Sequence, residues 1–170
     1  MNDLVHDNAA CLEQGMTLLR QLAAADYTAR CPACFNSSVG GHIRHNTDHY
    51  EQFLAGWAEG KVDYDARTRA ARVESEPTYA ADLMRRLRIA LEAIPNEALD
   101  AELQVKMDGG SSAAWSRSTV RRELQFLLSH TIHHYALIVA ILHAHDLAAE
   151  IPTGFGVAPS TLKHRAPASA

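Results

Sequence analysis

The sequence lacks the features that direct a chain to nucleic acid or to a membrane. Its 16 lysines and arginines are outnumbered by 20 acidic residues, for a formal net charge of −4, whereas proteins that follow phosphates carry a basic surplus. No apolar stretch approaches the roughly 20 residues that span a bilayer. The acidic start MNDLVHDNAACLEQ also differs from a secretory signal. We therefore expect a cytoplasmic protein with no nucleic-acid partner and no membrane partner.

Cysteine is scarce and odd in number, with Cys11, Cys31 and Cys34 alone. A reducing compartment would keep all three as thiols. The segment Cys31-Pro-Ala-Cys34 has the spacing of a redox or zinc dithiol, but no strand-to-helix setting accompanies it, and no second CxxC completes a zinc knuckle. The chain also contains no nucleophile elbow and no phosphate-binding glycine loop. These absences leave the histidines as the main indication of function.

Apolar residues recur at helical spacing in four segments, at about residues 3–25, 38–60, 78–94 and 118–147. Ser37 or Ser38 can cap the second segment, and Pro95 ends the third. The spacing predicts an all-α fold, an up-down four-helix bundle with a long charged crossover between helices two and three. Around Asp108-Gly109-Gly110, a small hairpin or a loop precedes the last helix. We expect residues 1–150 to form the bundle and 151–170 a frayed C-terminal tail.

Eight of the ten histidines lie in two windows, residues 41–50 and 129–145. His130 and His134 are i and i+4 neighbours, so their rings project from one side of the fourth predicted helix and can converge on one ion. Leu127 and Ile138 occupy the same sector, which places the pair toward the bundle interior. Buried imidazoles without partners are costly, so a ligand or hydrogen bonds are needed there. His133 points about 60° away and is a candidate for a supporting role.

The first window offers a third imidazole from a neighbouring helix. His42, His45 and His49 all lie on or beside the apolar face of the second predicted helix. Helical phase alone places His42 and His49 nearer the centre of that face than His45. Three imidazoles on two rigid helices leave a coordination position open for water or substrate, as in catalytic metal sites.

The segment SSVGGHIRHNTDHY and the later segment LLSHTIHHYALI resemble the DinB/YfiT-like superfamily of metal-binding four-helix bundles. The resemblance extends from the first predicted helix to the end of the fourth. It implies a three-histidine site of His45, His130 and His134 for a divalent transition metal ion, zinc or nickel first and iron as a further candidate. His42 and His49 remain alternates to His45. The resemblance also implies a homodimer.

Several members of this superfamily resemble thiol-dependent transferases, which implies a small-molecule substrate or a low-molecular-weight thiol as partner. Asp48 can accept a hydrogen bond from a ligand imidazole. In the crossover, Arg67, Arg69 and Arg72, with Tyr64 nearby, can clamp an anionic substrate. Two hypotheses follow, a metal-dependent transferase or hydrolase and a non-catalytic dimeric metal-binding bundle with a stress-related or structural role.

Overall fold

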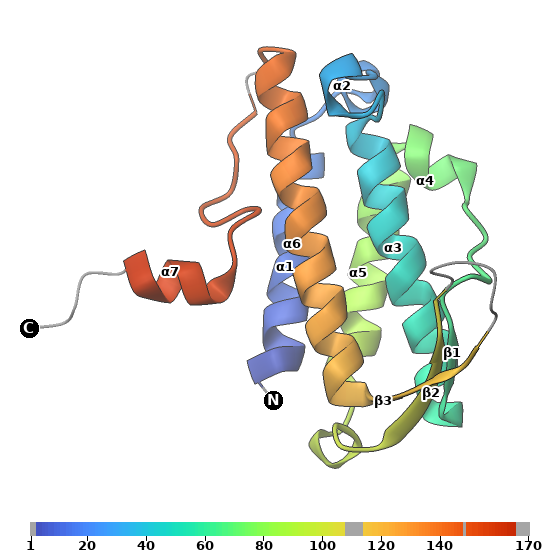
Figure 1. Cartoon of the computed structure of the whole chain (residues 1–170). Helices are drawn as coiled ribbons and strands as arrows, with labels where there is room; N and C mark the ends of the chain where they lie inside the picture. The colour runs from blue at the N-terminus through green and yellow to red at the C-terminus, as the bar shows by residue number, and fades with distance from the viewer. Residues whose placement is uncertain (1–2, 108–113, 148, 166–170) are drawn as a thin grey trace, which may run out of the picture.

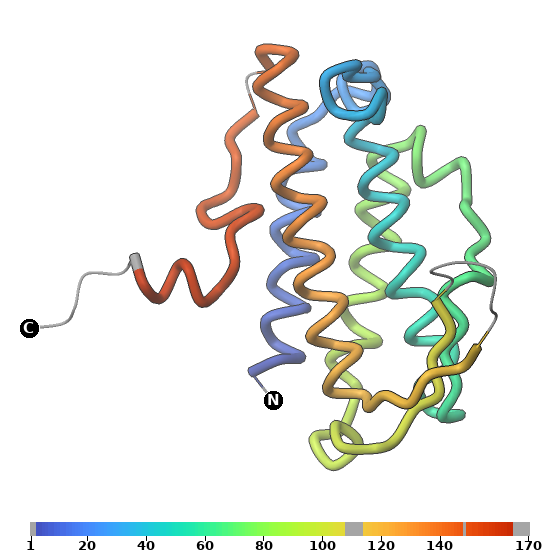
Figure 2. The backbone as a smooth tube through the Cα atoms, in the orientation of Figure 1, coloured from blue at the N-terminus to red at the C-terminus, as the bar shows by residue number. Residues whose placement is uncertain are grey.

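The computed structural model describes residues 3–107, 114–147 and 149–165 (Figure 1). Four long helices run side by side (Figure 2), α1 (Asp3–Leu19), α3 (Val39–Gly56), α5 (Pro77–Glu92) and α6 (Val120–Ala144). α1 packs against α5 and α6, and α3 packs against the same two helices. Each long helix lies within one of the four predicted segments, except that α5 begins one residue earlier. The prediction of a mostly helical protein is therefore confirmed.

The all-α prediction needs correction, because the described residues include a three-stranded sheet of β1 (Lys61–Asp63), β2 (Glu102–Lys106) and β3 (Ser116–Thr119). β2 pairs with β3 in antiparallel register, as the predicted hairpin requires, although its expected turn at residues 108–110 lies outside the described residues. β1 pairs with β2 in parallel. A strand of three residues in a charged crossover is too short for an alternating pattern to reveal it.

Short elements connect the long ones. The predicted first segment is divided into α1 and a separate α2 (Ala24–Thr28), and the crossover contains β1 and α4 (Ala71–Ser75). Three 3₁₀ turns complete this part of the chain, η1 (Pro32–Cys34), η2 (Trp57–Glu59) and η3 (Asn96–Ala98). Gly56 ends α3 beside β1, and a Cβ there would lie 2.0 Å from the carbonyl oxygen of Lys61. Only glycine lets the crossover turn back so closely against the helix.

A buried polar network fixes three helices relative to one another. The Tyr50 hydroxyl on α3 donates to Oδ1 of Asn8 on α1 (2.8 Å), and Thr131 on α6 donates to the same Tyr50 oxygen (3.3 Å). Asn8 also donates to the backbone carbonyl of Leu124 (3.1 Å). Since all three side chains are buried and bonded, a shift of one helix would leave polar groups unsatisfied. Tyr50 and Thr131 each directly follow a histidine, so the network sets the position of both histidine windows.

The described part of the C-terminal segment, residues 149–165, packs on the bundle, unlike the predicted frayed tail. Residues 149–158 lead to a short helix, α7 (Pro159–Arg165), beside α1 and α6. The Phe155 ring is buried and stacks on Tyr135 at 4.1 Å between ring centroids. The side chain of Gln21 exchanges two hydrogen bonds with the backbone of Glu150 (2.8 and 3.0 Å). This segment therefore covers part of the bundle, although the sequence showed no amphipathic pattern there.

α6 is the one described helix long and apolar enough, by length and composition, to cross a membrane. The expectation that no stretch approaches that length overlooked it, because histidines and hydroxyl residues interrupt its apolar character. Core helices of bundles meet the same criterion. α6 packs against α1 and α3, and it buries Leu127, Ile138 and Leu142 between them. This packing buries 33% of the most apolar part of α6.

The cap of α3 gives a first testable prediction. The Ser38 side chain accepts a hydrogen bond from the Gly41 backbone N–H (3.0 Å), so Ser38→Ala leaves that donor unsatisfied. We expect a loss of about 1 kcal/mol in the free energy of unfolding, measured by urea denaturation. Ser37→Ala is the matched control, since no side-chain hydrogen bond of Ser37 is present among the described residues. Equal effects of the two substitutions would contradict the assignment of the cap.

Candidate metal centre

Four imidazole rings meet between α3 and α6. His45 and His49 are i and i+4 neighbours on α3, and their ring centroids lie 4.6 Å apart. His130 and His134 form the equivalent pair on α6, also at 4.6 Å. Across the interface, His45 lies 4.9 Å from His130 and 4.6 Å from His134, and His49 lies 4.5 Å from His130. The two windows thus form one cluster, which we call the histidine cluster.

The structure brings together the three histidines implied as ligands by the resemblance, His45, His130 and His134, but it also favours a second set. The side-chain nitrogens of His45, His49 and His130 lie within 4.8 Å of one another, close enough to hold one ion. His134 is instead in contact with His42, whose Nδ1 lies 2.8 Å from the Nδ1 of His134. His45 and His130 belong to both sets, and the third ligand is His134 or His49.

Hydrogen bonds fix the tautomer of His49. Its Nδ1 lies 2.7 Å from the His45 carbonyl oxygen, which can only accept, so Nδ1 carries the proton. Nε2 of the neutral ring is therefore an acceptor, and Arg67 donates to it from Nη1 (3.2 Å). Backbone bonds of this kind orient ligand imidazoles in known metal sites. The lone pair that His49 would offer a metal is, in this arrangement, occupied by an arginine.

Several polar atoms in the histidine cluster and beside it are buried without a hydrogen-bond partner among the described residues. They include Nε2 of His42, Nε2 of His130 and both amide atoms of Asn46, which lies one turn along α3 from His42. An unsatisfied buried polar atom costs about 1–3 kcal/mol, and native structures contain few of them. A metal ion satisfies a free imidazole nitrogen directly, so His130 fits the role of a ligand. Sequence reasoning did not single out Asn46, because an asparagine on a helix gives no signal of its own.

The electrostatics of the cluster favour neutral rings. Burial, followed by its histidine neighbours and Arg67, lowers the pKa of His45 to about 2. Burial and neighbouring histidines lower the pKa of His134 to about 3 and, with Arg67, that of His130 to about 4, and burial also lowers the pKa values of His42 and His49. At neutral pH all five rings are uncharged, which is the form that binds a metal.

Residues predicted to support the site have different roles in the structure. Asp48 is buried and pairs with Arg44 (3.1 Å) rather than with an imidazole. Burial raises the pKa of Asp48, and Arg44 opposes that shift. The Tyr64 hydroxyl donates to Glu123 (2.9 Å), while its ring lies 5.6 Å from His49. Tyr64 therefore forms a wall of the cluster instead of a clamp for substrate.

Of the three crossover arginines, Arg67 alone reaches the histidine cluster. Arg72 is exposed and pairs with Glu76 (2.9 Å), and Arg69 is exposed. His133 is also exposed, although its ring lies 5.2 Å from that of His134. The predicted three-arginine clamp is thus reduced to a single guanidinium beside His49.

An aromatic wall separates the cluster from a neighbouring pocket. Phe126 stacks on His130 at 5.3 Å and lies 5.6 Å from Tyr64. Tyr64 and Phe126 also line a pocket of about 190 Å³, together with Val105, Met107, Arg122 and Glu123. A small molecule in this pocket would lie one aromatic ring away from the imidazoles.

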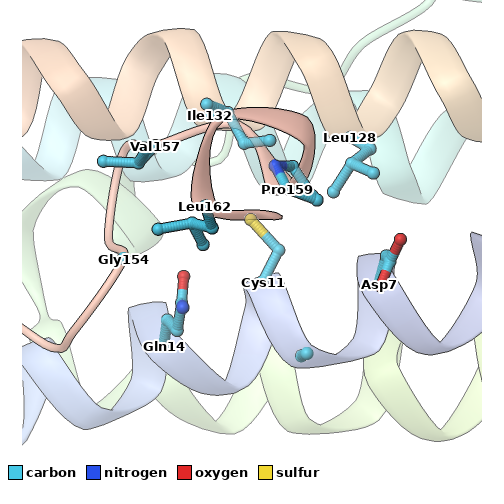
Figure 3. Close-up of a pocket in the computed structure, with 10 residues that line it drawn as sticks. Asp7, Cys11, Gln14, Leu128, Ile132, Gly154, Val157, Pro159 and Leu162 are labelled. Carbon is cyan, nitrogen blue, oxygen red and sulfur yellow. The ribbon is translucent and has the colours of Figure 1, made fainter. Parts of the chain in front are cut away.

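A second pocket, shown in Figure 3, lies between α1, α6 and the C-terminal segment. Leu128 and Ile132 line it and project from the side of α6 opposite His130. Its one thiol belongs to Cys11, and burial raises the pKa of that thiol to about 12. A protonated, buried thiol is a poor nucleophile. This pocket therefore takes no part in the chemistry of the histidine cluster.

The CxxC pair shows no sign of an activated thiolate. Cys31 precedes the short turn η1 and Cys34 is its last residue, and both side chains are buried. Burial and the adjacent Cys31 thiol raise the pKa of Cys34. Redox dithiols depend on a lowered pKa at a helix N-terminus, which is the opposite arrangement.

The fold and the cluster define a class of protein, a helical bundle in which imidazoles from two facing helices meet at one point. A sequence profile of the DinB superfamily matches residues 12–138, and the chain belongs to that superfamily. The resemblance stated from the histidine windows is thereby confirmed.

Two known proteins are similar to this chain, one in structure and one in sequence. A crystal structure of the DinB-like protein YjoA from Bacillus subtilis superimposes with a TM-score of 0.64 at 20% identity, covering 88% of this chain and 96% of that one. A protein named FK506-binding protein 5, from Rhizopus delemar, is 33% identical over 106 residues. That match covers 61% of this chain and 27% of the relative, so the chain corresponds to about a quarter of the fungal protein. The first comparison supports the fold, and the second concerns one part of a longer protein.

The lowered histidine pKa values predict how stability depends on pH. In the folded protein without metal, the rings stay neutral far below pH 6.5, whereas the unfolded chain takes up protons there. Stability is therefore fully present above about pH 6.5 and falls as the pH drops toward the folded pKa values of about 2 to 4. Each such histidine adds at most about 1.4 kcal/mol per pH unit to the slope.

The measurement is urea unfolding between pH 7.5 and pH 5.5 with a chelator present. His45→Gln removes one titrating ring, so its stability should fall less steeply than that of the wild type. Asp48 and Glu51 have raised pKa values that act in the opposite direction, and both are unchanged in the variant. Equal slopes for the two proteins would show that His45 is not held neutral by the fold.

Proposed function

We propose that this protein binds one divalent transition metal ion between α3 and α6, with His45, His130 and His134 as ligands. Zinc or nickel is the proposed ion, with iron as a third candidate, because borderline ions accept neutral imidazole readily. The observation that carries the proposal is the buried, unpartnered Nε2 of His130 within a cluster of neutral rings. Without an ion, the fold would bury these nitrogens at a cost that nothing offsets.

His134 is preferred over His49 as the third ligand because of their hydrogen bonds. The contact of His134 with His42 uses Nδ1, so its Nε2 remains available to an ion while His42 holds the ring. His49 has its Nδ1 on a backbone carbonyl and its Nε2 on Arg67. For His49 to bind an ion, Arg67 would have to move. This distinction is the reason to keep His134, although the nitrogens of His49 lie close to those of His45 and His130.

The proposed activity is that of a metal-dependent, thiol-linked transferase or a related hydrolase. A divalent ion held by three imidazoles keeps a position open and lowers the pKa of a water or thiol bound there. Phe126 and Tyr64 limit access of water from one side, and the pocket that they line offers space for an electrophilic small molecule. This combination of an open site and an adjacent pocket favours chemistry over a purely structural ion.

The alternative is a non-catalytic, dimeric metal-binding bundle with a structural or stress-related role. It is favoured by the burial of the rings beside the proposed ligands, since His42 and His49 are only 6% and 4% exposed, whereas His45, His130 and His134 are half-buried. A structural ion would have a closed coordination shell, and its removal would lower the melting temperature steeply. A catalytic ion would bind exogenous thiols, which can be detected by spectroscopy in the cobalt-substituted protein.

The ligand set predicts the metal content of single variants. Elemental analysis of untagged protein should give about one equivalent of a transition metal, which His45→Ala and His130→Ala should both abolish. His134→Ala should lose the metal as well, whereas His49→Ala should retain most of it. His143→Ala, an exposed histidine on the same helix, is the matched control and should bind like the wild type.

Two outcomes would change the proposal. Retention of metal by His134→Ala together with its loss from His49→Ala would replace His134 by His49 in the ligand set. A wild-type protein that stays free of metal after reconstitution with zinc, nickel and iron would overturn the proposal.

A further inference from the structure

Arg67 is an unusual arginine in this protein. It lies half-buried in the crossover, and its Nη1 donates to His49. Its Nε is buried with no hydrogen-bond partner in the described part of the chain. No carboxylate of the described residues forms an ion pair with it. A guanidinium whose Nε–H is buried without a partner carries a desolvation cost that a hydrogen-bond acceptor would offset.

The neighbouring arginines each have carboxylate partners or access to water. Arg44 on α3 bonds to both Asp48 (3.1 Å) and Glu74 (2.9 Å). Arg72 in α4 is held by Glu76 and lies over the Tyr79 ring. Arg69 is exposed, so water satisfies it. Arg67 alone of these four is placed against the histidine cluster while lacking both a carboxylate and full access to water.

The Nε side of the Arg67 guanidinium is suited to bind a carboxylate. In a guanidinium, the Nε–H and the adjacent amino group present two parallel donors, the arrangement that matches the two oxygens of a carboxylate. Because Nη1 is already engaged by His49, the Nε edge remains for a ligand. The imidazoles beside it are neutral, so one positive charge is available and a single carboxylate would balance it.

We propose that Arg67 anchors the carboxylate of a small anionic ligand whose other end reaches the metal. The proposal rests on the metal site proposed above and specifies the substrate class for it, a carboxylate-bearing small molecule. Asp48 lies near enough to influence the site, since burial raises the pKa of its carboxyl while the charges of Arg44 and Arg67 oppose that rise. That negative charge disfavours a second anionic group on the ligand beside the first. The preferred ligand is therefore a monocarboxylate.

The test compares two thiols of similar length on cobalt-loaded protein, 3-mercaptopropionate and 3-mercapto-1-propanol. Thiolate coordination produces a charge-transfer band that reports binding without any catalytic assay. In the wild type, we expect the carboxylate thiol to bind about ten-fold or more tightly than the alcohol, because a hydrogen bond to a charged group is stronger than one between neutral groups.

Arg67→Gln removes the charge and keeps an N–H donor for His49. The variant should hold the same amount of cobalt and bind 3-mercapto-1-propanol as the wild type does, while its preference for the carboxylate disappears. Arg69→Gln is the matched control, an exposed arginine in the same crossover, and should keep the wild-type preference.

The outcomes separate this inference from the proposed function. Cobalt binding with equal affinity for the two thiols in the wild type would overturn the role of Arg67 and leave the metal site intact. A preference that persists in Arg67→Gln, or that is lost equally in Arg69→Gln, would also overturn it. Failure of the wild type to bind cobalt at all would overturn the proposed function, and this inference with it.

Discussion

The structure depends on one constraint, the burial of uncharged imidazoles between α3 and α6. His45 and His130 contribute from opposite helices, and their pKa values are lowered first by burial and then by neighbours that include His49 and Arg67. Such rings cannot relieve their cost by taking up protons at neutral pH, so they require hydrogen bonds or an ion. The Nε2 of His130 has no partner among the described residues. The proposed metal ion would offset that cost by bonding to this nitrogen.

Elements distant in the sequence hold the cluster in place. The bonds among Tyr50, Asn8 and Thr131 fix the relative positions of three helices one residue from the cluster. The Ser38 cap starts α3, and the close approach at Gly56 turns the chain into the crossover. The crossover then returns Arg67 to the histidine face of α3, eighteen residues from His49 in the sequence. The same bundle geometry therefore positions both the histidine cluster and Arg67.

Much of the fold and the cluster follows from spacing alone. Helical periodicity predicts the four long helices, and the i, i+4 rule predicts that His130 and His134 share a face. Spacing does not predict β1, which is three residues long, or the docking of Phe155 on Tyr135, which has no local pattern. It also leaves the rotation of α3 undecided between His42, His45 and His49. That choice depends on packing and on Arg67, both of which require the three-dimensional structure.

The most direct test of the central claim is X-ray absorption spectroscopy of the zinc-loaded protein, with His130→Ala as comparison. The account predicts a first shell with three imidazole nitrogens at about 2.0–2.1 Å and one further light-atom ligand in the wild type. His130→Ala should bind no stoichiometric zinc. A first shell without imidazole nitrogens, or a shell unchanged in the variant, would contradict a metal centre between α3 and α6.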